Sequence, residues 1–198
     1  MKRITLIVLA NLFFGLACSL AQVQNLTVEP NHSTIGFKVP IAGGMTLVYG
    51  RFSEFDLKLS LIDGDWTKLG ASFIIQAGSI DTGIKGRAEH LRSADFFDVE
   101  KYPEIVFKIS EIVEAGENTF LARGPFTMHG VTRNLEIPFQ VLGVDGNTIG
   151  IQVRMKLNRR DFGVGSGFTH SSIENFLADE IDVEINFWTK RDKRESVD

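Results

Sequence analysis

Apolar and polar residues alternate with a period of two along most of the chain, and this alternation limits the fold more than any other feature. Successive side chains of a β-strand point to opposite faces, so each alternating segment is predicted to be a strand with one apolar face. About eight such segments follow one another, at residues 34–41, 48–61, 73–77, 105–110, 119–128, 135–141, 149–157 and 181–187.

Turn sequences separate these segments and favour antiparallel connections. They are "DGD" (63–65), "EAGEN" (114–118), "MHGVT" (128–132) and "VDGN" (144–147). Strands with one apolar face must bury that face, either by closing into a barrel or by pairing two sheets. Strands of eight to ten residues would span roughly 30 Å, so a barrel of this kind would have a long apolar interior.

Three places depart from the alternation. Its phase changes near Ser53 and Glu54, which indicates a bulge. Residues 84–98 have helix-like spacing and predict a short helix between strands. Residues 158–179 form a glycine-rich connection, and loops of this length inside a compact domain are usually functional or disordered.

The first residues, "MKRITLIVLANLFFGLACSLAQ", have the pattern of a secretory signal peptide: a basic start, an apolar run and a small-x-small site. We predict cleavage after residue 21, a single domain at 22–191 and a charged C-terminal tail at 192–198. The product would be periplasmic or secreted, with no internal disulfide, because Cys18 leaves with the signal. A lipoprotein signal using Cys18 is the alternative, but Gly15 stands where a branched apolar residue is usual.

Neither nucleic-acid binding nor a membrane-spanning segment in the mature chain is favoured by the sequence. Without the two basic residues of the signal, the chain has 19 basic and 25 acidic side chains, a net charge of about −6, which does not favour nucleic acid. No apolar run after residue 21 approaches the ~20 residues that span a bilayer.

Catalytic and metal-binding patterns are weak. His90 with Asp95 or Asp98 resembles a base and its orienting carboxylate, but no nucleophile accompanies them and "GVGSGF" lies in a loop rather than a strand-to-helix turn. The histidines form no HxH or HxxxH pair; they stand singly at His32, His90, His129 and His170. We predict no catalytic residue, no metal site and no cofactor.

Phenylalanine is abundant, with 16 residues in the chain. Seven are predicted on inward strand faces: Phe37, Phe52, Phe55, Phe107, Phe126, Phe139 and Phe187. Such side chains either fill a core or line a tube that binds a long hydrocarbon chain. Composition does not choose between the two.

Six motifs, in this order and spacing, resemble the YceI-like family of exported bacterial proteins that bind polyisoprenoid lipids. They are "HSTIGFKV" (32–39), "GRF" (50–52), "SIDTG" (79–83), "HLRSADFFDVEKYPEIVFK" (90–108), "GPFTMHGVTRNLEIPFQV" (124–141) and "NRRDFG" (158–163). The resemblance implies an all-β fold, an extended, lipocalin-like eight-stranded antiparallel barrel whose apolar bore takes an isoprenoid or a similar amphiphile. One departure is Ile41, near which many relatives carry a histidine, so their head-group recognition is not carried over.

The resemblance favours the tube, and the site predictions follow from it. The predicted bore residues are Phe37, Val39, Phe52, Phe55, Leu57, Phe73, Ile75, Phe96, Phe97, Phe107, Ile109, Phe126, Met128, Ile137, Phe139, Val153, Met155 and Phe162. The predicted head-group contacts are Arg87, His90, Arg92 and Arg160. For the arginines the alternative is structural: Arg160 pairs locally with Asp161, and the other two lie on a solvated helix face.

The stretch "HLRSADFFDVEKYP" (90–103) is then interpreted as a collar of the barrel. Asp95 is predicted to cap the turn that presents Phe96 and Phe97 to the bore, and Pro103 to precede the next strand. The predicted function is non-catalytic storage or transport of a polyprenyl phosphate or a quinone-like lipid, by one chain or a homodimer. The alternative is a filled barrel that acts as an interaction module, with Trp66, Trp188 and the "AGG" loop (42–44) as outer contacts.

Overall fold

A computed structural model describes residues 21–191; the predicted signal segment, except for its last residue, and the charged tail lie outside these residues. Within them the chain forms twelve strands, one α-helix and four short 3-10 helices. The strands are β1 (Val23–Val28), β2 (Thr34–Ile41), β3 (Thr46–Phe52), β4 (Phe55–Ile62), β5 (Asp65–Gln76), β6 (Ile80–Asp81), β7 (Glu104–Lys108), β8 (Glu111–Gly116), β9 (Thr119–Met128), β10 (Val131–Asp145), β11 (Thr148–Asn158) and β12 (Glu180–Arg191). The helices are α1 (Lys85–Arg92), η1 (Pro30–His32), η2 (Ala42–Gly44), η3 (Ala77–Ser79) and η4 (Arg159–Phe162).

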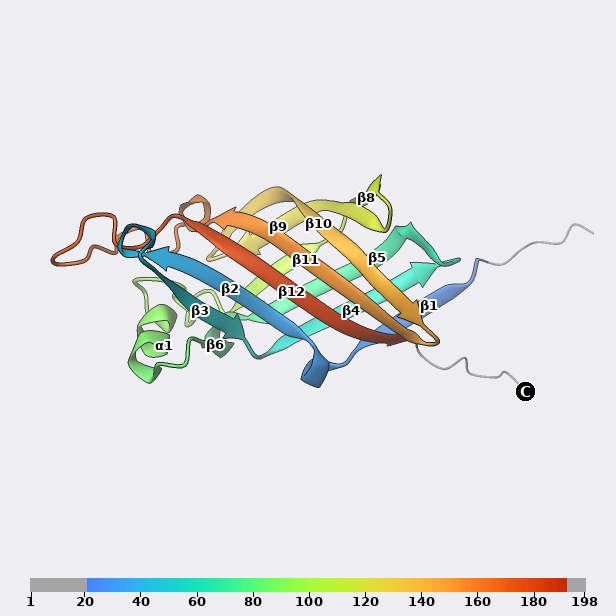
Figure 1. Ribbon diagram of the computed structural model, residues 1–198, viewed down its shortest axis with the longest axis horizontal. Helices are drawn as coiled ribbons and strands as arrows, with labels where there is room; N and C mark the ends of the chain where they lie inside the picture. Colours follow the sequence, from blue (N-terminus) through green and yellow to red (C-terminus); the bar gives the residue numbers. More distant parts are fainter. Residues whose placement is uncertain (1–20, 192–198) are drawn as a thin grey trace, which may run out of the picture.

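The strands close into an antiparallel barrel (Figure 1). The sheet runs β4-β5-β7-β9-β10-β11-β12, and β1 closes it by pairing with both β4 and β12. Three of the eight barrel strands are each made of two segments: β2 continues β1 along β12, β4 continues β3, and β8 continues β7 along β9. The predicted fold class, an eight-stranded antiparallel barrel with one short helix, is therefore confirmed.

The interruptions have local causes. The predicted change of phase at Ser53 and Glu54 is the break between β3 and β4. Between β7 and β8 the backbone approaches β9 so closely that a Cβ on Gly124 would lie 1.9 Å from the carbonyl oxygen of Lys108. Only glycine fits at such a contact, so the close approach itself requires this residue.

Two strand predictions were incomplete. β1 was not predicted, because its sequence, "VQNLTV", has little alternation of apolar residues. The segment "EAGEN" was predicted as a turn, but β8 extends through Gly116 and the turn itself is Glu117 and Asn118. Asn118 has a left-handed φ of 52°, which asparagine tolerates better than most residues.

The two ends of the barrel differ (Figure 1). One end, here called the turn end, carries the tight turns at residues 63–64, 117–118 and 146–147. The other end carries α1 and the irregular segments 93–103 and 159–179, which together are called the collar. The first and last described residues lie toward the turn end, on the right of Figure 1, while the collar lies on the left.

Side chains fill the barrel near the turn end. Leu61 and Ile149 are 1% and 0% exposed, and Thr189 donates a hydrogen bond of 3.1 Å to the Ile149 carbonyl. The rings of Trp66 and Phe120 lie 6.3 Å apart, and that of Phe120 stacks on Phe139 at 5.2 Å. The name plug is used below for five of these side chains: Leu61, Trp66, Phe120, Ile149 and Thr189. Trp66 therefore packs against the core rather than acting as an outer contact, whereas Trp188 is 45% exposed.

Candidate functional site

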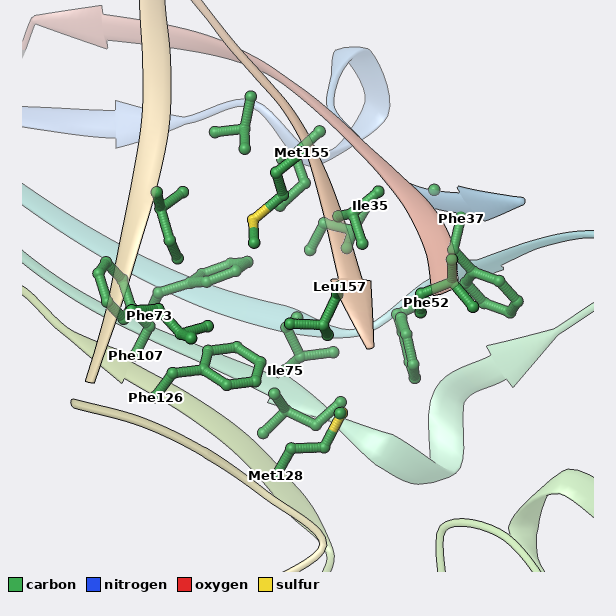
Figure 2. Close-up of a pocket in the computed structure, with 18 of the residues that line it drawn as sticks. Ile35, Phe37, Phe52, Phe73, Ile75, Phe107, Phe126, Met128, Met155 and Leu157 are labelled. Carbon is green, nitrogen blue, oxygen red and sulfur yellow. The ribbon is translucent and has the colours of Figure 1, made fainter. Parts of the chain in front are cut away.

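A cavity of about 210 Å³ lies inside the barrel, between the plug and the collar. It is larger than the ~150 Å³ apolar cavities that stay dry and take up small hydrocarbons. Its wall comes from the barrel strands and from the collar, and Figure 2 shows strand side chains that point into it. The side chains drawn there are carbon throughout, apart from the two methionine sulfurs.

Sixteen of the 18 predicted bore residues lie on this wall; Phe55 and Phe162 do not. Phe55 begins β4 at the break after β3, and its ring packs against Phe73 and Phe187, at 6.4 and 5.8 Å. Phe162 is completely buried behind Phe126, with ring centroids 5.3 Å apart. Both rings pack against residues of the wall without lining the cavity themselves. Ligand contact by the other sixteen stays a prediction.

The wall also includes residues outside the predicted site. Many were predicted to point inward but were not assigned to a site; others come from the start of β5 and from the collar. They are Ile35, Gly36, Leu59, Leu69, Ala71, Ile80, Leu91, Ile105, Ala122, Leu135, Ile151, Leu157, Arg159, Val164, Leu177, Ile181, Val183, Ile185 and Phe187.

The degree of burial changes along the bore. Inward-facing Leu57, Phe73, Phe126 and Met155 pack against the core yet stay partly exposed, because they border empty space. The plug residue Ile149 is inward-facing too, but it is fully buried. The barrel is therefore filled at the turn end and hollow toward the collar.

Arg159 is the one charged side chain on the described wall. It is 5% exposed, and its guanidinium donates to the carbonyls of Ala178, Val164, Gly165 and Leu177 and to the carboxylate of Asp179. These contacts use all five N–H donors of the guanidinium. Burial lowers its pKa from the ordinary value, and Asp179 opposes that effect. Arg159 holds the 159–179 segment together, and no donor is left for a ligand.

Two predicted head-group arginines also bind the chain itself. Arg87 Nε donates to Thr82 Oγ1 at 2.8 Å, and Nη2 to the Thr82 carbonyl at 3.0 Å. Arg92 donates to the carbonyls of Gly78 and Ile80, at 2.7 and 2.8 Å. Neither residue lies on the cavity wall. Both fix α1 to the segment before it, a role that neither the head-group prediction nor the solvated-face alternative described.

The other two candidates lie outside the wall as well. Nε2 of His90 lies 2.9 Å from Oδ2 of Asp95, so Asp95 contacts a side chain instead of capping the turn as predicted. Arg160 pairs with Asp179, not with Asp161 as predicted. Adjacent arginines, 159 and 160, thus have different roles: the first is buried on the wall and the second is exposed.

The collar places Phe96 and Phe97 at the end of the bore, and both line the cavity. Phe96 is 6% exposed and contacts the rings of His90 and Phe168, at 5.0 and 5.2 Å. Phe97 meets Phe52 edge-on at 5.8 Å. β7 starts at Glu104, directly after Pro103, as predicted.

Residues 21–191 show neither a metal cluster nor a membrane-spanning helix. No group of three or more His, Cys, Asp or Glu side chains there is placed to hold a metal ion. The helices of the same part of the chain include none with the length and apolarity needed to cross a bilayer.

Comparison with known proteins agrees with this architecture. The model of the YceI-like domain matches residues 26–188. The chain belongs to the YceI-like family. A UPF0312 protein of Photorhabdus laumondii is 28% identical over 156 residues, which cover 76% of this chain and 80% of the relative. A UPF0312 protein of Vibrio cholerae is 32% identical over 141 residues, covering 67% and 72%.

Solved structures share the fold at lower identity. The crystal structure of Burkholderia cenocepacia BcnA superposes with a TM-score of 0.73 at 22% identity and covers 81% of this chain and 98% of its own. A polyisoprenoid binding domain from Saccharophagus degradans, implicated in plant cell wall breakdown, gives 0.65 at 16% identity, covering 84% and 98%. These neighbours support the closed barrel described above.

Proposed function

We propose that this YceI-like protein binds one long-chain isoprenoid lipid, such as a polyprenyl phosphate or a quinone-like amphiphile, with its tail in the bore. The observation that carries the proposal is the apolar cavity between plug and collar, whose one charged wall residue has no free donor. An isoprenoid tail needs no polar partner, and burying it contributes about 0.8 kcal/mol per CH2. One five-carbon unit therefore contributes roughly 4 kcal/mol before the costs of ordering.

The comparisons support the same class of ligand. The family is shown by the domain match, and a solved neighbour with the same fold is a polyisoprenoid binding domain. We further propose that the protein stores or carries the lipid across an aqueous compartment, in the periplasm or outside the cell, and performs no reaction. One chain suffices, because the cavity is enclosed by a single barrel.

The head group is proposed to stay at the collar end, outside the bore. Burying a phosphate among hydrocarbon without a partner is too costly, and the arginines first predicted to meet it are engaged within the chain. A neutral quinone ring or an alcohol could enter further than a phosphate. Tail length should therefore govern affinity more than head-group charge does.

The test is lipid content and lipid uptake. Protein purified from its host is analysed by native mass spectrometry, and delipidated protein is titrated with a polyprenol and a long-tailed quinone in detergent solution. We expect a co-purifying lipid and saturable uptake of one molecule per chain. Absence of both would refute the proposal.

A matched pair of variants locates the site. Ala71 lies on the wall and is partly exposed to the cavity, so Ala71→Phe places a ring in the bore. Ser72 is the next residue of the same strand and points to the opposite face, so Ser72→Phe adds the same ring outside. We expect Ala71→Phe to lose uptake at least tenfold and Ser72→Phe to keep it, with circular dichroism confirming that both fold. Equal uptake by the two variants would place the lipid elsewhere.

A further inference from the structure

The turn between β2 and β3 is an exposed apolar projection at the collar end. Met45, Leu47 and Tyr49 are 82%, 42% and 59% exposed. Residues 39–50 contain no charged side chain, although 23% of the chain is charged. Exposed apolar side chains grouped in this way mark a contact surface rather than ordinary scatter. The segment 42–49 is called the β2–β3 tip.

β3 has little cover on its outer edge. Its pairing with β6 is limited to Arg51 and Phe52, and no strand of the described chain pairs with that edge along residues 46–50. Alternation places Leu47 and Tyr49 on one face of β3 and Val48 on the other, toward Val39 of β2. The apolar side chains of the tip are therefore free to contact something outside the barrel.

Cations border the tip. Arg51 and Lys38 flank the uncharged stretch; Lys38 Nζ lies 5.9 Å from the centroid of the Tyr49 ring and 3.5 Å from Glu184 Oε2, so Arg51 is the cation better placed to meet a phosphate. An apolar tip with a tyrosine and basic residues at its base suits a phospholipid surface, where apolar atoms enter the acyl boundary and cations stay among the phosphates. The unpaired backbone of the β3 edge limits how deeply the tip can enter the bilayer, because its N–H and C=O groups must stay hydrated at the interface.

The tip is joined to the hollow end of the bore. Ala42 donates a backbone hydrogen bond of 2.7 Å to Phe176 of the collar, and Ile41 bridges to Leu177, which lines the cavity. On the same hairpin, Phe37 and Phe52 line the cavity with ring centroids 5.8 Å apart. Contact at the tip would therefore bring the hollow end of the bore near the membrane.

We propose that the β2–β3 tip docks the protein on a phospholipid bilayer and brings the collar end of the bore to the membrane surface. This inference rests on the proposed function, because it supplies the place where a lipid tail enters and leaves. A tail would then move between bilayer and bore without crossing bulk water, where its exposure is unfavourable.

The test measures vesicle binding of the whole protein by flotation, with vesicles of phosphatidylcholine alone and with added phosphatidylglycerol. The double variant Met45→Glu with Leu47→Glu places two charges on the tip. We expect the wild type to float with the vesicles and the double variant to lose affinity about tenfold or more. The control is Leu142→Glu, because Leu142 is 57% exposed on β10, near the turn end; its binding should equal that of the wild type.

Two results would overturn the inference: a wild type that does not bind either kind of vesicle, or equal loss of binding in the double variant and the control. Uptake of a polyprenol from detergent solution separates this inference from the proposed function. If the double variant keeps that uptake but loses transfer from vesicles, docking is supported. If the wild type takes up no lipid from detergent, the proposed function fails, while vesicle binding still decides the docking.

Discussion

Replacing Gly165 by alanine should destabilise the protein, because this glycine lies directly over the collar residue Phe96. A Cβ at position 165 would lie 2.6 Å from Phe96 Cε1 and 2.8 Å from Cδ1. Phe96 cannot move away easily, since it is 6% exposed and held between the rings of His90 and Phe168. Gly165 also has a φ of +61°, in the left-handed region.

Two costs add at this position. A non-glycine residue in the left-handed region costs about 1–2 kcal/mol, and inserting an atom into a packed site costs about 1–3 kcal/mol. We therefore expect Gly165→Ala to lower the free energy of unfolding by about 2–5 kcal/mol.

Two nearby glycines separate these costs. Gly163 has a φ of +74°, but its added Cβ would lie 3.4 Å from the nearest atom, His129 Nδ1, so Gly163→Ala should show mainly the backbone cost of about 1–2 kcal/mol. The φ of Gly167 lies outside the left-handed region, and a Cβ added there would have no atom within 4 Å. Gly167→Ala should therefore be neutral or stabilising by about 0.4–1 kcal/mol.

The assay is urea unfolding followed by far-ultraviolet circular dichroism, with the three variants and the wild type under one set of conditions. The expected order of stability is Gly167→Ala, then Gly163→Ala, then Gly165→Ala. If Gly165→Ala costs no more than Gly163→Ala, Phe96 is not confined beneath the 159–179 segment, and the described end of the bore is wrong.

Three further predictions concern the same barrel. Arg159→Met should cost about 3–5 kcal/mol of unfolding free energy, because it leaves several buried carbonyls unpaired and removes one of the two arginines that pair with Asp179; exposed Arg160→Met should cost less than about 1 kcal/mol in the same denaturation assay. Hydrogen bonds from the side chain and backbone of Thr67 hold the pKa of Asp65 below its ordinary value of 3.8. Its stabilisation is thus present above about pH 4 and lost as pH falls through the folded pKa, so Asp65→Asn should flatten stability measured against pH in acid. Gly124→Ala should cost about 3 kcal/mol, because its Cβ would meet a backbone carbonyl oxygen, whereas Gly143→Ala, with open space around it, should be nearly neutral by thermal unfolding.

Alternation was sufficient to predict most of the barrel, because each barrel strand must bury one face. It placed Phe107, Phe139 and Met155 inward, where the structure has them. It did not predict β1, in which polar residues occupy half of the positions and break the alternation. Local pattern predicts a strand only where the strand itself is amphipathic, and β1 is held by its two partner strands.

Which inward residues border open space was beyond the pattern. Leu57 and Leu61 lie on one face of β4, yet the first lines the cavity and the second belongs to the plug. The difference comes from what lies opposite in the barrel, which is a long-range property. Likewise, nothing local distinguishes Arg159 from Arg160; only the folding of the 159–179 segment buries one guanidinium and leaves the other in water.

The plug has a consequence for the dimensions of any guest. Because side chains fill the turn end, a tail bound as proposed would occupy the bore from the collar side and stop where the plug begins. The free end of the tail would then lie against the plug. Each further five-carbon unit beyond the depth of the bore would project from the collar end. On the proposed function, the depth of the bore would therefore set how much of a tail the barrel covers. Shortening a plug side chain such as Leu61 should lengthen the bore and shift the binding preference toward longer tails.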